Sequence, residues 1–532
     1  MAFLRRGFEN ISQIGPRKSL VILIFACASA SILGFFMPSV QGWLLLGALI
    51  AFSLLLLTLI WPEAATLFFI FITYINLVAV LSRHHDVPVI LGAGTSVILV
   101  IPIVSYVVVQ RKPLVFPLML PLMIIYLLTM IISTLLSEHL SVSIAYISTV
   151  SLEGVALCLL VSNVIRTSAT LRRVTWFLLL AGSLMGALSI YQELTHSYRN
   201  DFGGFAQVDT AAFKVGEDLY GKVLRPRLAG PIGEKNRYAQ VMLVLFPLAL
   251  FRFWGEKSRR LRILAAGSAV LILGATILTF SRGALVALFV LMVVMIVLRY
   301  IRLHQAILVS LIFVVLIVVV APDYVIRVDS LRRVQSLFSD DTGESAPDGA
   351  IVGRLTENLA ALNTFLDHPV WGVGPGQYFK DYSMKYANAL NMRLLAKNRR
   401  AHSLYLEIAA DTGLIGLSAF MAIVVVTMVQ LWRLRRYWLY RRPDSANMLT
   451  AFFLSVVAYL AAGMFLQLSY QRYYWLLLTL ANSAIYVYQR ETRPAGSLDR
   501  LTVEKSETRS TSLPGDRLLL PSYRVNTPAG QE

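Results

Sequence analysis

His402 stands where proton chemistry could take place, directly before a long apolar segment. The stretch that precedes it contains five cations and no acid: Lys385, Arg393, Lys397, Arg399 and Arg400. Nearby positive charge disfavours the protonated ring, so the imidazole stays neutral and can accept a proton. The pattern therefore indicates a general base at His402, with Arg399 and Arg400 as supporting cations. The alternative is an interfacial histidine that only hydrogen-bonds to its own loop.

Two carboxylates follow His402 inside the apolar segment. Glu407 and Asp411 are four residues apart, a spacing that puts both on one face of a helix. They could orient His402, line a polar cavity, or lie on a helix start that dips into water. Gly413 and Gly416 come next, and they predict a kink or a break in this unusually long segment.

Arginines stand at two further edges of apolar blocks. Arg282 separates two such blocks within Thr-Phe-Ser-Arg-Gly (279–283). Arg227 and Asn236 belong to a segment rich in Arg, Gly and Pro (225–237). A guanidinium presents a rigid fork of donors that suits phosphate oxygens. The structural alternatives are an arginine that snorkels to the membrane interface and an ordinary basic loop.

A glycine-rich turn runs from Trp371 to Gly376. Its backbone N–H groups could bind an anion, but it lacks the Gly-Lys-Ser/Thr of a phosphate-binding loop, so a tight structural turn is favoured. The sequence has no HExxH motif. Cys27 and Cys158 lie far apart in separate apolar blocks. We therefore expect no metal site and no cofactor.

The elements that must position these residues are apolar helices. The chain has 532 residues, of which 57% are hydrophobic and 15% charged, with a mean hydropathy of +0.67. Soluble domains carry about 25% charged residues, so this chain has too little charge to coat a water-facing surface. A soluble enzyme, a disordered protein and a fibrous repeat are excluded, and the apolar blocks lack the alternation of a β-barrel. The predicted fold is an all-α, polytopic membrane protein.

Fourteen apolar blocks approach the length of about 20 residues that a helix needs to cross a bilayer, with twelve as the lower bound. Their ranges are 19–38, 41–61, 64–81, 89–109, 114–136, 144–163, 174–194, 237–254, 262–280, 283–300, 304–321, 403–432, 448–468 and 473–488.

Lys and Arg concentrate in every second connection between these blocks. The positive-inside rule then puts both termini in the cytoplasm and the loops 195–236 and 322–401 outside, in the periplasm of a bacterial inner membrane. The second loop contains a helix-like stretch (354–366) and is expected to form a small subdomain. Because the cytoplasmic loops account for most of the net charge of +18, no nucleic-acid partner is needed to explain it.

The predicted organisation has five parts. A cytoplasmic segment (1–18) precedes eleven spans (19–321), the outside subdomain (322–401) and three last spans (402–488). A polar tail (489–532) is expected to be disordered and cytoplasmic. The first apolar block follows basic residues as a signal peptide would, but it lacks a small-residue cleavage site and is therefore expected to be retained.

The ordered set of motifs resembles the O-antigen ligase/polymerase superfamily of bacterial membrane glycan transferases. The matching pieces are Arg-Leu-Ala-Gly (227–230), Thr-Phe-Ser-Arg-Gly (279–283), Arg354 heading a helix that runs to His-Pro-Val-Trp-Gly-Val-Gly-Pro-Gly (368–376), and His-Ser-Leu-Tyr-Leu (402–406) followed by Gly413 and Gly416. The long outside loop before the histidine matches as well. The resemblance covers residues from about 225 to 420.

This resemblance implies an undecaprenyl-diphosphate-linked glycan as donor and a metal-independent, inverting glycosyl transfer. It assigns His402 as the general base for the acceptor hydroxyl. It assigns Arg282, Arg354 and, less strongly, Arg227 to the diphosphate, whose charge arginines must stabilise where no Mg²⁺ does. The implied acceptor is a glycan or lipid A-core, and membrane lipids, a flippase and a chain-length regulator are candidate partners.

Several functions stay open within and beyond this family. Fourteen spans favour a polymerase of O-antigen or exopolysaccharide repeat units over a ligase, which usually has twelve. A protein O-glycosylating member is a third option. The alternative from another class is a lipid-linked oligosaccharide flippase or other transporter, which should show paired repeats and polar residues at the membrane midplane. Here the candidate residues crowd the outer edge, which favours an enzyme.

Overall fold

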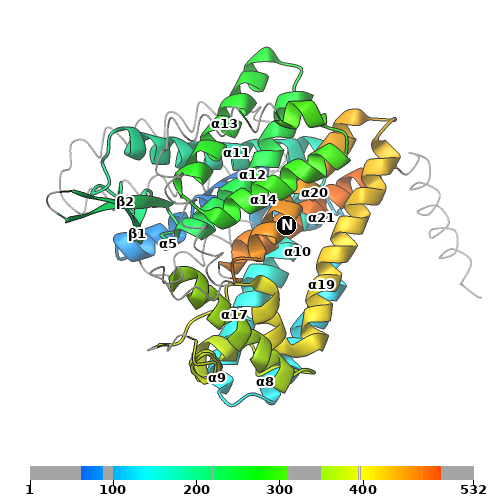
Figure 1. Cartoon of the computed structure of the whole chain (residues 1–532). Coiled ribbons are helices and arrows are strands. Elements are labelled where there is room, and N and C mark those ends of the chain that lie inside the picture. Colours follow the sequence, from blue (N-terminus) through cyan, green and yellow to red (C-terminus); the bar gives the residue numbers. More distant parts are fainter. Residues whose placement is uncertain are drawn as a thin grey trace, which may run out of the picture. The chain divides into compact units, whose positions relative to one another are not determined.

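The computed structural model describes residues 62–87, 100–218, 221–307, 311, 349–392, 395, 397–468 and 470–492, which are mostly helical (Figure 1). Several predicted features lie outside these residues: the first two spans, most of the eleventh span, residues 322–348 of the second loop, Arg393, and the tail beyond residue 492. Residues 1–488 form one compact unit, and residues 489–532 form a second. All contacts described below lie within the first.

The elements carry the labels of Figure 1. In chain order they are α4 (Pro62–Tyr74), α5 (Leu77–His84), α7 (Val100–Val104), the π-helix η2 (Ser105–Val109), α8 (Met119–Leu135), α9 (Leu140–Thr149), η3 (Val150–Ala156), α10 (Leu157–Val164), α11 (Ser168–Leu194), β1 (Gln207–Asp218), β2 (Gly221–Gly230), α12 (Lys235–Gly255), α13 (Arg259–Leu278), α14 (Arg282–Val297), α17 (Gly349–Asp367), η5 (Tyr378–Tyr382), α18 (Ser383–Ala389), α19 (Leu404–Trp438), α20 (Pro443–Gly463) and α21 (Gln471–Arg490).

Six of the described helices are long and apolar enough to cross a membrane: α9–η3–α10 as one helix, α11, α12, α13, α19 and α20. A seventh candidate is the pair α4 and α5, which bends by 53° at the left-handed residue Asn76. A multi-pass helical membrane protein is therefore confirmed. The full number of fourteen spans stays a prediction.

Helices α12 and α20 lie at the centre of the described unit and pack against each other. In their most apolar stretches 67% and 78% of the residues are buried, compared with 33% in α13. Ile263, Leu264 and Val270 on α13 are instead largely exposed, as expected of side chains that face lipid. The helices that are apolar all round therefore divide into a buried centre and a lipid-facing periphery.

A two-stranded antiparallel hairpin, β1–β2, occupies part of the first predicted outside loop. Gln207 pairs with Gly230, Val208 with Leu228 and Asp209 with Arg227. An isolated hairpin is only marginally stable, and here β2 packs against α11, α12 and α13. The all-α expectation missed this element.

Helix α19 is broken at Gly413, which confirms the predicted kink. Gly413 has φ 65° and ψ −167°, a backbone conformation that is essentially restricted to glycine. The segment 368–374 runs alongside the break and supplies the missing partners. The N–H groups of Val373 and Gly374 donate to the carbonyls of Ala410 (3.0 Å) and Asp411 (2.9 Å).

The N–H groups of α19 that follow the break also find backbone partners in the segment 368–374. The N–H of Leu414 donates to the carbonyl of Pro369 (2.8 Å), and that of Ile415 to the carbonyl of Val370 (3.4 Å). Buried backbone groups at membrane depth need internal partners, and the segment 368–374 provides them. The structure therefore couples the break in α19 directly to the turn that follows α17.

The connections predicted to lie inside meet at one end of the helices. Arg172 and Arg252 both pair with Glu256, and Arg173 pairs with Glu63. Nearby, the hydroxyl of Tyr300, which follows α14, hydrogen-bonds with the hydroxyl of Thr450 on α20 at 3.0 Å. These contacts join the starts of α4 and α11, the end of α12, the segment after α14 and the first half of α20.

Two connections predicted to lie outside, those before α12 and before α21, meet at the bend between α4 and α5. Asn76 donates to the carbonyl of Pro231 (2.8 Å), and Tyr470 donates to the carbonyl of Ile232 (3.1 Å). The bend of α4–α5, the turn before α12 and the start of α21 therefore lie together. Pro231, Ile232 and Tyr470 belong to connections predicted to lie outside, whereas Asn76 lies within the predicted span 64–81. The orientation stays a prediction.

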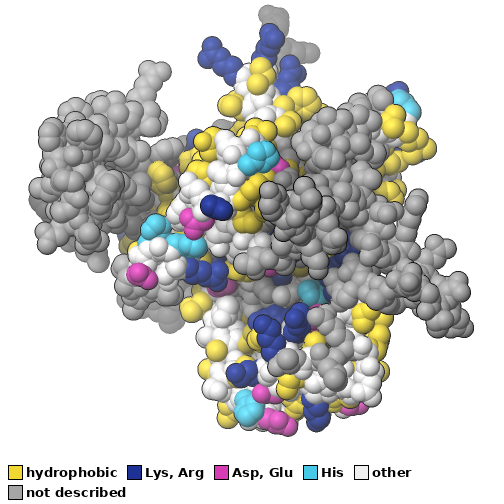
Figure 2. All heavy atoms as spheres, turned by 60° about the vertical axis from the view of Figure 1, so that its left-hand side comes forward, with side chains coloured by type: hydrophobic (Ala, Val, Ile, Leu, Met, Phe, Trp, Pro, Cys, Tyr) yellow, Lys and Arg dark blue, Asp and Glu magenta, His cyan; other side chains and the backbone are white. Residues whose placement is uncertain are grey.

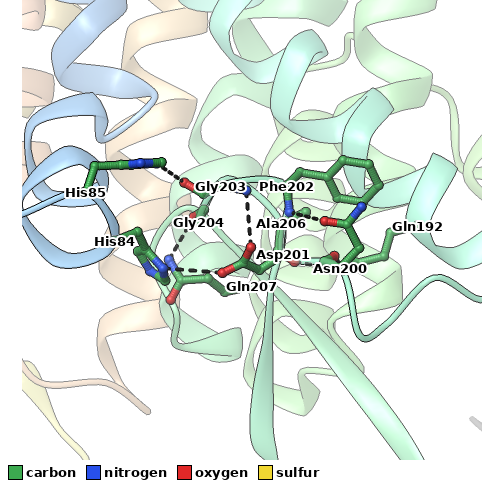
Figure 3. Close-up of polar contacts among 10 residues, drawn as sticks. All are labelled: His84, His85, Gln192, Asn200, Asp201, Phe202, Gly203, Gly204, Ala206 and Gln207. Atoms are coloured by element: carbon green, nitrogen blue, oxygen red, sulfur yellow. Dashed lines mark hydrogen bonds and ion pairs between the residues drawn. The ribbon is translucent and has the colours of Figure 1, made fainter. Parts of the chain in front are cut away.

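A further contact fastens the first of the two loops predicted to lie outside to the end of α5 (Figure 3). His84 Nδ1 lies 3.3 Å from Asp201 Oδ2, and His85 Nε2 lies 3.0 Å from the carbonyl of Gly203. Gln192 on α11 closes the other side of this loop through the carbonyls of Asn200 and Ala206. The loop 195–206 is thus held by side chains from two helices.

Candidate active site

The candidate base His402 lies beside a carboxylate that the sequence analysis did not pair with it. Glu357 on α17 approaches it with Oε2 at 3.0 Å from His402 Nε2. Glu357 is buried, whereas the His402 side chain is 30% exposed. Arg399 Nη1 lies 3.6 Å from the other carboxylate oxygen. The surroundings of His402 are therefore not purely cationic, and this part of the sequence interpretation was wrong.

Helix α19 fixes the position of His402 through its N-terminus. Ser403 caps the helix, because its hydroxyl accepts the N–H of Leu406 at 3.4 Å. Its carbonyl accepts the first helical hydrogen bond, from the N–H of Glu407. His402 is the residue immediately before the cap, so its ring stands at the positive end of a long helix.

Arg400 and Glu407 form the second ion pair of the site. Arg400 Nη1 donates to Glu407 Oε1 at 2.8 Å, and the guanidinium also lies over the ring of Phe379, 4.9 Å from its centre. Burial by itself lowers the pKa of Arg400, but the Glu407 carboxylate, together with Tyr146 and Asp411, more than offsets this effect, so the pKa is raised from its usual value. Arg400 is therefore a fixed positive charge held by Glu407.

Asp411 binds the glycine-rich turn instead of His402. Its carboxylate accepts the N–H of Gly376 at 2.9 Å and the N–H of Tyr378 at 3.0 Å. The structural interpretation of this turn is confirmed, since a protein carboxylate takes up two of the N–H groups that an anion would need. Glu407 and Asp411 are both buried, so the alternative of a helix start that dips into water is wrong.

Helix α17 confirms the predicted helix over 354–366 and brings two chemically important residues to one face. Arg354 and Glu357 are three residues apart and therefore lie one turn apart on the helix. Tyr378 holds this turn, because its hydroxyl donates to the carbonyl of Glu357 at 2.8 Å. Burial raises the pKa of Tyr378 far above its usual value, so the hydroxyl remains a donor.

Arg227 and the turn before Arg282 lie in direct contact. Arg227 on β2 is buried, and its Nε and Nη2 each donate at 3.0 Å, to the carbonyls of Thr279 and Phe280. Phe280 has a positive φ of 52°, and Ser281 caps α14 by accepting the N–H of Ala284. Arg282 is the first residue of α14, so Arg227 holds the turn that presents Arg282.

The segment around Asn236 is organised by a residue that the sequence analysis did not single out. Glu234 caps α12, and its carboxylate accepts the N–H groups of Asn236 (2.9 Å) and Arg237 (2.7 Å). Arg237 is buried and donates to Gln240 at 2.7 Å and to the carbonyl of Gln467. Much of the segment 225–237 thus serves the fold, and a role of Asn236 in binding stays a prediction.

The structure therefore assembles two groups from the predicted residues. The first combines His402, Arg399, Arg400 and Glu407 with Glu357, next to Arg354 on the same helix. The second combines Arg227 with the turn of Arg282. One face of the molecule shows Lys and Arg side chains gathered close to a His side chain (Figure 2). In the described part of the chain, no group of three or more His, Cys, Asp or Glu side chains could hold a metal ion.

The comparison with protein families decides how this arrangement is classified. Residues 267–421 match the family described as O-antigen ligase. These residues are called the O-antigen ligase domain below, because they match that family. The resemblance to the O-antigen ligase/polymerase superfamily is thereby confirmed for this segment, which is less than a third of the chain. No curated protein matches the chain.

The O-antigen ligase domain contains the first group in full and the second in part. It begins within α13, includes α14 and α17, and ends in α19 just beyond the break at Gly413. Arg282, Arg354, Glu357 and His402 all lie inside it, whereas Arg227 and Asn236 precede it. The domain therefore coincides with the elements that position His402 and with the helix that begins at Arg282.

Proposed function

We propose that this protein is a membrane glycosyltransferase that uses an undecaprenyl-diphosphate-linked glycan as donor at the outer face of the bacterial inner membrane. The observation that supports it most is the O-antigen ligase domain, within which His402 and Glu357 lie beside each other. Joining of repeat units into a polymer is favoured over transfer to lipid A-core, because fourteen apolar blocks exceed the usual number in ligases.

The chemistry follows from the residues. An acceptor hydroxyl attacks the anomeric carbon, the bond from that carbon to the diphosphate oxygen breaks with inversion, and His402 takes the hydroxyl proton. Undecaprenyl diphosphate leaves with the bonding electron pair. The guanidinium groups of Arg282 and Arg354 stabilise its growing charge, and Arg227 contributes through the turn that it holds.

A transfer assay tests this function. The purified protein in lipid nanodiscs would receive a lipid-linked repeat unit, with and without lipid A-core, and the products would be separated on a gel. A ladder of polymers indicates a polymerase, and a product that depends on lipid A-core indicates a ligase. EDTA should leave the yield unchanged. If neither acceptor yields a product while the protein moves the lipid-linked unit across a bilayer, the transporter alternative is correct.

The same proposal includes fourteen spans, cytoplasmic termini and a periplasmic site. We expect a cysteine at Ser197 to react with an impermeant maleimide in intact cells, because it lies in the first outside loop. A cysteine at Ser258, in the connection before α13, should react only after the cells are opened. Both variants need a background in which Cys27 and Cys158 are replaced. The reverse labelling pattern would contradict the orientation.

Arg282 should be sensitive to both charge and geometry. We expect Arg282→Ala to lower turnover by about 10²-fold or more, the usual cost of losing one donor to a developing negative charge. Arg282→Lys should recover part of the lost turnover, since the ammonium keeps the positive charge but lacks the forked hydrogen-bond donors of the guanidinium. Arg227→Ala should also lower turnover, because the turn before Arg282 loses two hydrogen bonds.

The matched control is Arg260→Ala, since Arg260 is an exposed arginine at the start of α13. It should keep wild-type turnover. Wild-type turnover in Arg282→Ala would return Arg282 to a topological role at the membrane edge.

A further inference from the structure

The contact between Glu357 and His402 differs from a surface ion pair, because the carboxylate is buried. The carboxylate is buried at 3% exposure, and its Oε2 approaches the imidazole Nε2 at 3.0 Å. The two atoms are within ion-pair distance, but their contact does not meet the angles of a hydrogen bond. Such loose alignment is common for catalytic contacts before substrate binds.

The other charged groups around His402 leave Glu357 as its direct partner. From the preceding loop, Arg399 lies at 3.6 Å from the far oxygen of Glu357, and Arg400 points to Glu407 at 2.8 Å. From α19, Glu407 is occupied by Arg400. The two arginines thus balance the two carboxylates, and the contact to the ring is made by Glu357.

The second ring nitrogen is in a different situation. His402 Nδ1 is buried, and no residue in the described part of the chain hydrogen-bonds to it. Buried polar atoms in native proteins nearly always have a partner, so an atom of this kind points to a group from outside the chain. If Nε2 carries the proton and faces the carboxylate, Nδ1 is the nitrogen with the free lone pair.

We propose that Glu357 is a positioning residue: it holds His402 in the Nε2–H tautomer and thereby makes Nδ1 the nitrogen that accepts the proton of the acceptor hydroxyl. The proposal rests on the proposed function, in which His402 is the base. The proton passes from the hydroxyl oxygen to Nδ1 as the oxygen bonds to the anomeric carbon. Glu357 remains a carboxylate and stabilises the imidazolium that forms.

The alternative is that Glu357 only anchors Arg399. The two roles differ in how turnover depends on pH. A carboxylate beside the ring favours the protonated imidazole, so removing its charge should make the ring harder to protonate. The acidic side of the pH profile, where His402 gains a proton and turnover falls, should then move to lower pH. A purely structural anchor would not move it.

The test compares Glu357→Gln and Glu357→Asp with the wild-type, full-length protein in nanodiscs. Glutamine preserves the size of the side chain and loses the charge. We expect Glu357→Gln to lower turnover by about 10- to 10²-fold, less than loss of the base itself. Its half-maximal pH on the acidic side should fall, because the carboxylate charge next to the ring is gone. Glu357→Asp should keep the wild-type pH profile and part of the turnover.

The matched control is Asp367→Asn, which removes a carboxylate from the exposed end of the same helix. It should change neither turnover nor the pH profile. The proposal is overturned if Glu357→Gln keeps wild-type turnover, or if turnover falls while the pH profile stays in place. A wild-type protein that transfers no glycan at any pH would instead overturn the proposed function.

Discussion

Replacement of His402 by alanine should lower glycan transfer by about 10²- to 10⁴-fold, the usual contribution of a general base. A sugar hydroxyl is a weak nucleophile near neutral pH, so the step depends on a group that takes its proton. His402→Gln should lose as much, since an amide can hydrogen-bond but cannot accept the proton. Donor binding should persist in both variants, because the arginines that bind the diphosphate are unchanged.

The measurement is turnover at saturating lipid-linked donor, together with the dissociation constant of the donor from a binding assay. His368→Ala serves as the control, because His368 is an exposed histidine at the end of α17, in edge contact with Tyr382. Wild-type turnover in His402→Gln would show that His402 is not the general base. If His402→Ala also abolished donor binding, His402 would be a ligand of the diphosphate.

The parts of the site that the sequence predicted are those determined by local patterns. The helix-like stretch 354–366 before the glycine-rich turn predicts α17, and the structure places a helix there. The polar residues before Leu404 mark the start of α19, and Gly413 marks its break. In each case the information lies within a few neighbouring residues, where helix caps and glycine backbone preferences act.

The parts that it missed depend on contacts between distant segments. Glu357 and His402 meet because α17 packs against α19, which no local pattern encodes. Asp411 binds backbone N–H groups, and these are present in every sequence. The hairpin was missed because Pro226, a residue unfavourable in strands, lies within β2 and because the strands lack a strict alternation of apolar and polar residues.

Replacement of Gly413 by alanine should unfold the O-antigen ligase domain locally and abolish transfer, although Gly413 belongs to neither charged group. An added Cβ would lie 2.3 Å from the carbonyl oxygen of Val370 and 2.6 Å from the nitrogen of Trp371. Both are backbone atoms, so no side chain can move aside. The backbone conformation alone adds a strain of about 1–3 kcal/mol for any residue but glycine.

Relief of this strain would separate α19 from the segment 368–374. The four hydrogen bonds that join them would break, and Asp411 would lose its hold on the turn that leads to η5. The segment 368–374 directly follows α17, which carries Glu357, and α19 directly follows His402. If the segment and α19 separate, Glu357 and His402 should therefore move apart. The expected result is a clearly lower unfolding temperature in detergent and no measurable turnover.

The control is Gly267→Ala on α13, where an added Cβ meets nothing within 4 Å. A Gly413→Ala protein with wild-type stability and turnover would show that the broken helix is not needed to hold the candidate base in place.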